Sequence, residues 1–479
     1  MIRLRKKYTE FPIQAKASFW FLICAFLQRG ISMLTTPIFT RLLSTSQYGQ
    51  FSVFNSWMGI LTILITLNLS SGVYVQGLVK YEEERNIYAS SLQGLTFAMV
   101  LTWTIIYLSF RQFWNRLLSL TTVQVLAMLV IIWMSAVFNF WAAEQRVLYH
   151  YQILVYVTLF VSLVNPLLGI FLINHAEDKV TARILGIALV DFISYAGFFI
   201  IQMRRGKKLF HAYFWKYALL FNLPLLPHYL SMTVLNSADR IMIRNIVGED
   251  KAGIYSLAYS VSNIMTMLHS ALMQTISPWM YQKIKCKKTE NIAPVAYMTL
   301  ILVAAANLLL IVFAPEIVAI FAPAPYYEAI WIIPPVAMSA YFTYSYDLYA
   351  KFAFYYEKTL LIMMASVVGA SLNVILNWIF IRHYGYIAAG YTTLFCYSIF
   401  SVAHYTLMNR ICKIYCDGIR PYNSGIILKI TIAFLLSGFL LLTTYNHRVI
   451  RYGILLISFS TIWLQRRIFA RILRHLNPK

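Results

Sequence analysis

The chain has 479 residues, of which 60% are hydrophobic and only 12% are charged, and its mean hydropathy is +0.66. Soluble domains carry about 25% charged residues, so this composition excludes a soluble globular protein and indicates a polytopic membrane protein. The formal net charge of +23 does not indicate nucleic-acid binding, because Lys and Arg lie in short clusters between apolar segments.

Long apolar segments follow one another from the N-terminus to the C-terminus. A helix needs about 20 residues to cross a hydrocarbon core of about 30 Å, and the alternation of a β-barrel is absent. We therefore expect an all-α polytopic membrane protein with about 14 transmembrane helices. The predicted spans are 17–40, 50–69, 89–110, 121–141, 150–173, 183–203, 214–236, 252–281, 293–313, 328–350, 359–381, 386–409, 425–444 and 449–465.

The distribution of basic residues predicts the orientation of these spans. Lys and Arg number 27 on the side of the N-terminus and 11 on the opposite side. Cytoplasmic loops of membrane proteins carry the excess of Lys and Arg. With an even number of spans, we expect both termini to be cytoplasmic.

An internal repeat divides the chain. Segment 38–56 resembles segment 241–260, with Gly49 and Gly253 204 positions apart, and Asn165 and Asn373 begin two similar segments 208 positions apart. Helices 1–6 and 7–12 are therefore interpreted as two parallel copies related by an axis along the membrane normal. The predicted division is a six-helix lobe over 1–205, a second six-helix lobe over 206–412, and helices 13 and 14 with a basic tail over 413–479.

Three stretches carry a resemblance to a known family: TPIFTRLLSTSQYGQFSVF, NSADRIMIRNIVGEDKAGIYSLAYSVS and LNVILNWIFIRHYGYIAAGYTTL. They resemble the polysaccharide biosynthesis (Wzx-type) oligosaccharide flippases of the MOP exporter superfamily. The resemblance implies two lobes around a central cavity that opens alternately to each side of the bacterial inner membrane. It implies an undecaprenyl-pyrophosphate-linked glycan, such as an O-antigen or capsule repeat unit, as substrate. A polysaccharide polymerase and a chain-length regulator would be functional partners. Helices 13 and 14 are similar to the pair that forms a groove for the lipid tail in the lipid II flippase branch.

Arg29 is the leading candidate for contact with the pyrophosphate. It lies near the middle of the first span, where a charge costs about 3 kcal/mol or more unless it faces a protein interior or a wet cavity. The alternative is a pairing with an internal acid such as Asp191. Arg240, Arg41 and Arg244 are further candidates for the cavity or the headgroup region, and snorkelling to the membrane surface is the alternative for the last two.

Four ionisable residues at membrane depth are candidates for coupling to an H⁺ or Na⁺ gradient: Asp191, Asp347, His228 and His269. Asp347 has a simpler alternative, a helical pair with Lys351 four residues later. The tyrosines around Asp347, including Tyr341, Tyr344 and Tyr349, are either an interfacial belt or a surface for the glycan. Asn165, Asn373 and Asn377 are expected to join neighbouring helices.

The sequence holds no Walker loop, no metal-binding His cluster and no nucleophile with its base, so we expect no enzyme activity, no metal and no cofactor. Cys412 and Cys416 lack further metal ligands nearby. Two other functions remain as alternatives. A MATE-like multidrug exporter would need acidic residues in its cavity, and a membrane polysaccharide polymerase would be expected to carry a large extramembrane loop.

Overall fold

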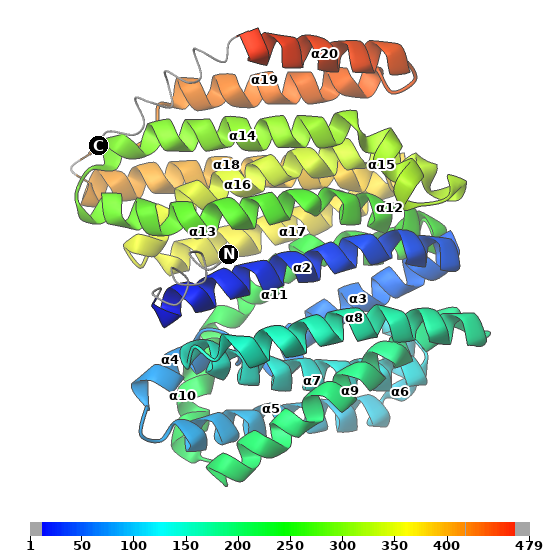
Figure 1. The fold of residues 1–479 in the computed structure, drawn as a ribbon, viewed down its shortest axis with the longest axis vertical. Helices are drawn as coiled ribbons and strands as arrows, with labels where there is room; N and C mark the ends of the chain where they lie inside the picture. Colours follow the sequence, from blue (N-terminus) through cyan, green and yellow to red (C-terminus); the bar gives the residue numbers. More distant parts are fainter. Residues whose placement is uncertain (1–11, 417, 465–479) are drawn as a thin grey trace, which may run out of the picture. The chain divides into compact units, whose positions relative to one another are not determined.

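The computed structural model describes residues 12–416 and 418–464, and these residues form helices and no strand. The chain forms two compact units, one through Ile241 and one from Met242 onward. Each is described by itself, with the helices labelled in Figure 1. Each predicted span falls on one or more helices, although 50–69 runs three residues past the end of α3 and residue 465 lies outside the described residues. This agreement confirms the predicted all-α class.

The first unit begins with a long helix and ends within α11. Its helices are α2 (Ile13–Leu42), α3 (Thr45–Thr66), α4 (Val73–Lys80), α5 (Arg85–Ser109), α6 (Arg111–Leu118), α7 (Thr122–Val147), α8 (Tyr151–His175), α9 (Lys179–Gly206), α10 (Ala212–Asn222), the short η1 (Leu223–Leu225) and α11 (Leu226–Ile246).

The second unit contains the remaining helices, with α12 and α13 dividing the long predicted span 252–281 at Asn263. They are α12 (Glu249–Ser262), α13 (Ile264–Lys285), η2 (Thr289–Asn291), α14 (Ile292–Val312), α15 (Ala314–Phe321), η3 (Ala324–Trp331), α16 (Ile333–Tyr355), α17 (Thr359–Tyr384), α18 (Ala388–Tyr415), α19 (Ser424–Thr443) and α20 (Arg448–Leu464).

By length and composition, nine segments of the described chain are apolar enough to cross a membrane. The other predicted spans lie on α3, α12–α13, α16, α18 and α20. α16 shows why such a span is less apolar: most of its residues, including Tyr341 and Ser345, are buried against other helices of the unit. A helix that faces protein rather than lipid can carry hydroxyl groups, provided that they find hydrogen-bond partners.

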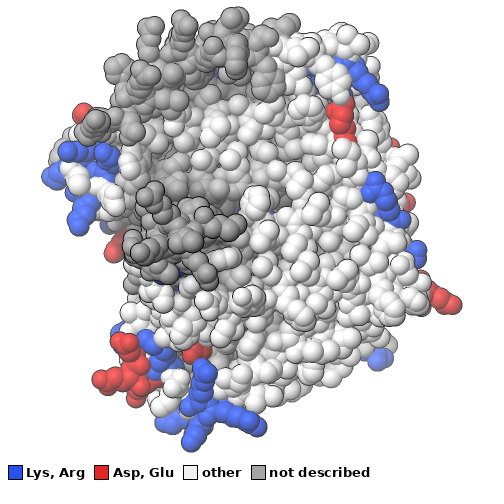
Figure 2. Space-filling view, in the orientation of Figure 1, with Lys and Arg blue, Asp and Glu red and all other residues white. Residues whose placement is uncertain are grey.

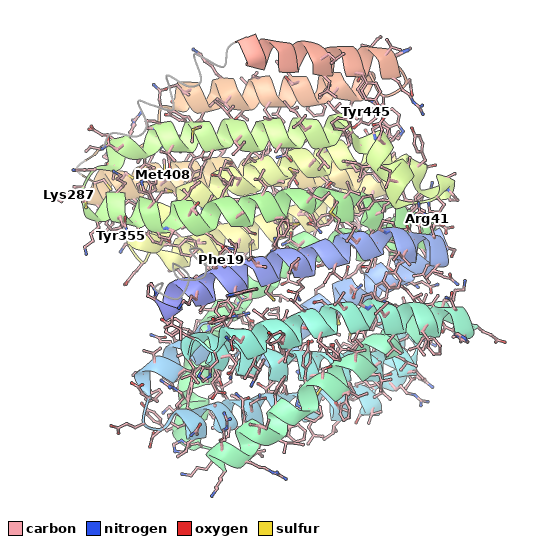
Figure 3. All side chains as sticks on the ribbon, viewed as in Figure 1. Phe19, Arg41, Lys287, Tyr355, Met408 and Tyr445 are labelled. Atoms are coloured by element: carbon pink, nitrogen blue, oxygen red, sulfur yellow. The ribbon has the colours of Figure 1, made fainter. Side chains whose placement is uncertain are left out.

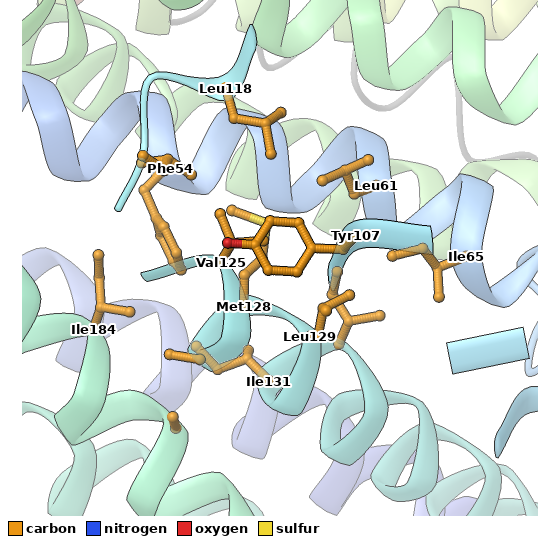
Figure 4. Packing of buried hydrophobic residues seen from close by; sticks show 14 of the residues in the cluster. Phe54, Leu61, Ile65, Tyr107, Leu118, Val125, Met128, Leu129, Ile131 and Ile184 are labelled. Atoms are coloured by element: carbon orange, nitrogen blue, oxygen red, sulfur yellow. The ribbon is translucent and has the colours of Figure 1, made fainter. Parts of the chain in front are cut away.

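Apolar side chains hold α3, α5, α7 and α9 together in the first unit. Figure 4 shows part of this cluster, in which Phe54, Tyr107, Met128 and Ile184 meet from different helices. The Tyr107 hydroxyl donates to Asn115 Oδ1 at 2.9 Å, so the ring is buried without losing its polar partner. In each unit, the charged side chains visible in Figure 2 gather towards helix ends and leave an uncharged face between them. This is the pattern expected of helices that cross a bilayer.

The joint between the predicted lobes packs onto the first unit. Phe214 and Ala218 of α10 are fully buried in a cluster with Tyr74 and Tyr88. Asn222 Nδ2 donates to the carbonyl oxygen of Leu67 at 2.8 Å. The first compact unit therefore includes α10. The boundary between the two sequence repeats, placed between residues 205 and 206, stays a prediction.

The last two helices are attached to the second unit by polar contacts. Arg451 of α20 is fully buried and donates to Glu316 of α15, and the Tyr452 hydroxyl donates to the same carboxylate at 2.8 Å. Tyr445, labelled in Figure 3, donates to the carbonyl oxygen of Ile311 at 2.7 Å. In the same figure Lys287 and Tyr355 mark the other end of this unit's helices. The sequence pattern counts Arg451, at the start of the predicted span 449–465, among the basic residues that set orientation and does not predict its burial.

Candidate functional site

The second predicted span is interrupted where the chain leaves α3. Leu67 and Asn68 adopt left-handed backbone conformations with φ of 50° and 51°, and Gly72 has a φ of 57°. α4 begins directly afterwards at Val73, and no side chain caps its first turn. Non-helical backbone at membrane depth is tolerated where it is buried in protein or lines a water-filled cavity. A break of this kind, at the end of the predicted span 50–69, is therefore a place to look for a binding site.

A polar pocket of about 440 Å³ lies against this break. This volume is within the range of ligand pockets, about 300–1,000 Å³. One wall is α7, where spacings of four and three residues place Asn139, Ala143 and Arg146 on one helical face. The pocket is lined by Asn68, Ser70, Ser71, Gly72, Val75, Asn139, Ala143, Arg146 and Val147.

Arg146 is the one charged side chain among these lining residues. Its side chain is exposed, and in the part of the chain that the structure describes it forms no ion pair. A guanidinium offers several donors in a planar fork, which suits a phosphate or carboxylate ligand. In the sequence, Arg146 counts only as one of the 27 basic residues that predict orientation. Its seven-residue spacing from Asn139 could have indicated the site, because this spacing places two polar side chains on one face of an apolar helix.

Aromatic rings fix α4 on the other side of the break. Tyr74 packs edge-to-face against Phe140 of α7, with ring centroids 4.6 Å apart. Tyr88 of α5 donates its hydroxyl to the carbonyl oxygen of Val73 at 2.7 Å. Its ring lies over Gly77, where an added Cβ would be 2.1 Å from Tyr88 Cζ. The short helix is therefore held at one position against α5 and α7.

A second polar cluster lies between α13 and α16 in the second unit. Asp347 Oδ1 accepts from Lys351 Nζ at 2.7 Å, and Asp347 Oδ2 lies 3.1 Å from His269 Nε2. The three side chains are between 13% and 20% exposed. The structure thus contains the predicted helical pair of Asp347 with Lys351. It also brings together two of the four candidate coupling residues.

The other two coupling candidates lie on different helices of the first unit. Asp191 is buried on α9, and the cation that interacts with it electrostatically there is Arg183, two turns earlier on the same helix. His228 lies on α11 beside Tyr229, with ring centroids 5.9 Å apart. The structure does not test whether either residue moves protons.

The sequence-based topology counts Arg183, the first residue of the predicted span 183–203, as an orientation marker, but it is a buried residue of α9. Its Nη1 donates to both the backbone oxygen and Oδ1 of Asn165 at 2.9 Å. Its guanidinium carbon lies 4.3 Å from the ring centroid of Phe39. Gly169 makes room for it, because an added Cβ there would be 2.3 Å from Arg183 Nη1. The predicted role of Asn165 in joining helices is confirmed, with a partner that the sequence does not predict.

The four predicted substrate-binding arginines occupy different surroundings. Arg29 is exposed in the middle of α2. Arg41, at the end of α2 in Figure 3, donates to the backbone oxygen of Pro37 at 2.8 Å. Arg240 on α11 donates to the backbone oxygen of Asn236 at 2.9 Å. Arg244 pairs with Glu249, with Nη2 and Oε1 3.1 Å apart. None of these contacts tests substrate binding.

The interpretation of the α16 tyrosines as a glycan surface is wrong for three of them. Tyr341, Tyr344 and Tyr349 are buried. Tyr341 bonds to Thr431 Oγ1 of α19 at 2.9 Å, and Tyr349 packs against Tyr405 of α18 with centroids 5.3 Å apart. These rings therefore join α16 to its neighbours. Within the described residues, no group of three or more His, Cys, Asp or Glu side chains could hold a metal ion.

Comparison with known families decides the identity of the chain. The family described as polysaccharide biosynthesis protein matches residues 15–284, more than half of the sequence. The chain belongs to this family. The MatE family also matches, over residues 224–379 in the region of the second repeat. The resemblance read from the sequence is confirmed at the level of the family.

Solved structures show that this family member has the fold of the MOP superfamily. Lipid II flippase MurJ in an inward closed conformation superposes with a TM-score of 0.71 at 14% identity, covering 93% of this chain and 99% of that chain. An inward-facing multidrug resistance MATE family transporter superposes with a TM-score of 0.59 at 14% identity, covering 81% and 96%. Both of these solved proteins are named as transport proteins.

A curated relative matches part of the chain. Lsg locus putative protein 1 of Haemophilus influenzae is 25% identical over 213 residues, which are 42% of this chain and 52% of the relative. The chain thus spans about half the length of the curated relative that it matches. The chain is thus a member of the polysaccharide biosynthesis protein family with the fold of the lipid II flippase and MATE transporter structures.

Proposed function

We propose that the protein is a flippase for undecaprenyl-pyrophosphate-linked oligosaccharide repeat units, working by alternating access in the bacterial inner membrane. The observation that carries the proposal is the polar pocket at the broken span, whose one charged lining residue is the cation Arg146. The family association with polysaccharide synthesis supports a glycan substrate, and the likeness to a lipid II flippase supports a lipid-linked one.

The charge of the pocket favours this function over export of cationic drugs. A multidrug exporter for cations would need acidic side chains to bind its substrates, whereas no Asp or Glu lines this pocket. A pyrophosphate needs fixed donors and positive charge, and a guanidinium with neighbouring Asn and Ser side chains supplies both. With both termini cytoplasmic, the Arg146 end of α7 faces the side from which a newly made lipid-linked unit arrives.

We propose protons rather than Na⁺ as the coupling ion, with the cluster of His269, Asp347 and Lys351 as the coupling site. Na⁺ would need oxygen ligands with free lone pairs and a net negative site. Both oxygens of Asp347 already face a nitrogen, and Lys351 compensates its charge. The His269 ring can carry a proton on one nitrogen or on both, and the second proton changes the cluster charge by one.

The test is to replace Arg146 with Ala in a strain whose surface polysaccharide depends on this protein. We expect surface polysaccharide to be lost and lipid-linked repeat units to accumulate on the cytoplasmic leaflet. Arg146→Lys should retain only part of the activity, because an ammonium lacks the planar fork. Arg116→Ala, which removes an exposed cation of α6, is the matched control.

Two results would contradict the proposal. Full-length surface polysaccharide in Arg146→Ala cells would mean that this cation has no essential role. Single repeat units reaching the outer leaflet without being joined would instead indicate a polymerase. Arg29→Ala, measured in parallel, reports whether the exposed cation of α2 serves the same substrate.

A further inference from the structure

Glu144 lies two residues before Arg146 on α7, yet it is turned away from the pocket. Its side chain is only 5% exposed, whereas Arg146 is exposed. The residues that line the pocket include Ala143, Arg146 and Val147 but not Glu144. α7 thus separates a carboxylate, inside the unit, from a guanidinium that faces the pocket.

A chain of amides holds the Glu144 carboxylate in this position. Gln202 Nε2 of α9 donates to Glu144 Oε2 at 2.7 Å, and Gln93 Nε2 of α5 donates to Gln202 Oε1 at 2.6 Å. The side-chain amide of Gln202 accepts on its oxygen and donates on its nitrogen. The bond from Gln93 to that oxygen therefore fixes the amide in the orientation in which its nitrogen donates to Glu144. All three side chains are buried.

The charge of Glu144 is compensated from α9 and not from the pocket. Arg205 Nη1 lies 3.7 Å from Glu144 Oε1, and its side chain is 55% exposed. A buried carboxylate without a counter-charge is unfavourable and attracts the nearest cation. On the same α7 segment that cation is Arg146, so the pairing with Arg205 leaves the Arg146 charge available to a ligand.

We infer that Gln202 and Arg205 are specificity-determining residues: they neutralise Glu144 inside the first unit, so that the pocket keeps a net positive charge and selects anions. Neither residue lines the pocket, and both act through Glu144. The inference rests on the proposed function, since it requires that Arg146 bind the anionic part of the substrate.

The test uses the purified full-length protein in detergent and inorganic pyrophosphate as the probe, with binding measured by calorimetry. Arg205→Ala should weaken pyrophosphate binding about tenfold, because an uncompensated negative charge then acts near the anion. Arg205→Lys should bind nearly as the parent does. The neighbouring exposed Arg204→Ala is the control for a general loss of positive charge.

The decisive variant combines Arg205→Ala with Glu144→Gln. Glutamine keeps an oxygen that accepts from Gln202 but carries no charge to neutralise. The double variant should bind pyrophosphate within about twofold of the parent, a coupling that a merely structural role of Arg205 would not produce. The thermal midpoint of each variant shows whether it is folded.

The outcomes separate the two proposals. If the double variant binds as weakly as Arg205→Ala, or if Arg205→Ala binds normally while Arg146→Ala does not, the inference is wrong and the pocket assignment stands. If Arg146→Ala itself binds pyrophosphate normally, the assignment of the pocket to the anionic group fails.

Discussion

The two repeats build the same helix pair with different polar joints. In the first unit, Asn165 of α8 accepts from Arg183 of α9, a buried cation. In the second, Asn373 of α17 accepts from Asn377 Nδ2 at 3.1 Å, and Asn377 accepts from the Thr392 hydroxyl of α18. The bond between the two helices thus comes from Asn165 in the first unit but from Asn377, one turn after the equivalent Asn373, in the second. The joint is ionic in one unit and neutral in the other, so the repeat preserves a polar contact between the two helices but not its chemistry.

The corners, that is, the short turns that precede α3 and α12, also differ in whether neutral or charged side chains hold them. Ser44 and Gln47 form a capping box at the start of α3. At the matching corner of the second unit, Gly248 precedes α12 without a side-chain cap, and Arg244 pairs with Glu249 instead. A few residues on, Lys251 donates to Glu328 of η3 at 2.6 Å. The second corner therefore depends on charge where the first depends on neutral hydrogen bonds.

The largest effect is expected from removing the ionic joint. Arg183→Met should lower the free energy of unfolding by about 3–5 kcal/mol, because it leaves Asn165 and Asp191 without the buried cation. The measurement is the unfolding of the purified protein in detergent. Arg204→Met on the same helix, where the side chain is exposed, is the control. Equal losses in the two variants would show that Arg183 is no more than a surface charge.

The neutral joint should be less sensitive. Thr392→Val removes the hydroxyl that donates to Asn377 while keeping the side-chain shape, and an unsatisfied buried amide oxygen costs about 1–3 kcal/mol. The exposed Thr406→Val on the same helix should change the free energy of unfolding by less than about 0.5 kcal/mol. A loss for Thr392→Val as large as that for Arg183→Met would remove the distinction between the joints.

The smallest effect concerns the charged corner and its pH dependence. Hydrogen bonds from Lys251 and Tyr386 hold the pKa of Glu328, which precedes α16, below its usual range. A carboxylate with a lowered pKa stabilises the folded protein above its unfolded pKa of about 4.3, and the contribution is lost as the pH falls through the folded value. The parent should therefore lose slightly more stability than Glu328→Gln between about pH 6 and pH 3.

This difference should shrink at high salt, because the Glu328 side chain is 54% exposed and its charge is screened. Identical pH profiles for the parent and Glu328→Gln would show that the corner contributes no charge-dependent stability.

Sequence patterns can predict the helices, the repeat and contacts along one helix. Asp347 and Lys351 are predicted as a pair because residues four apart meet on a helix surface. Contacts between helices are harder to foresee. Arg183 and Arg451 lie near predicted span ends, where most basic residues only set orientation, and their burial depends on neighbouring side chains such as Asn165 and Glu316.

The pocket escapes prediction for a related reason. The stretch NLSSG at 68–72 is visible in the sequence, but the left-handed backbone at Leu67 is uncommon for a leucine and depends on the surrounding structure. Glu144 and Arg146 are neighbours in sequence, and which of them faces the pocket depends on Gln202, 58 positions away.

The attachment of α20 bears on how the chain can be shortened or fused. A truncated chain that ended before α19 would lack the partner of Glu316 and uncover Tyr341, whose hydroxyl bonds to Thr431. The last two helices are thus an integral part of the second unit and not a detachable appendage. A reporter domain joined beyond α20 leaves these contacts intact. A version without α19 and α20 would have to be redesigned at Glu316 and at Tyr341 before it could be expected to fold.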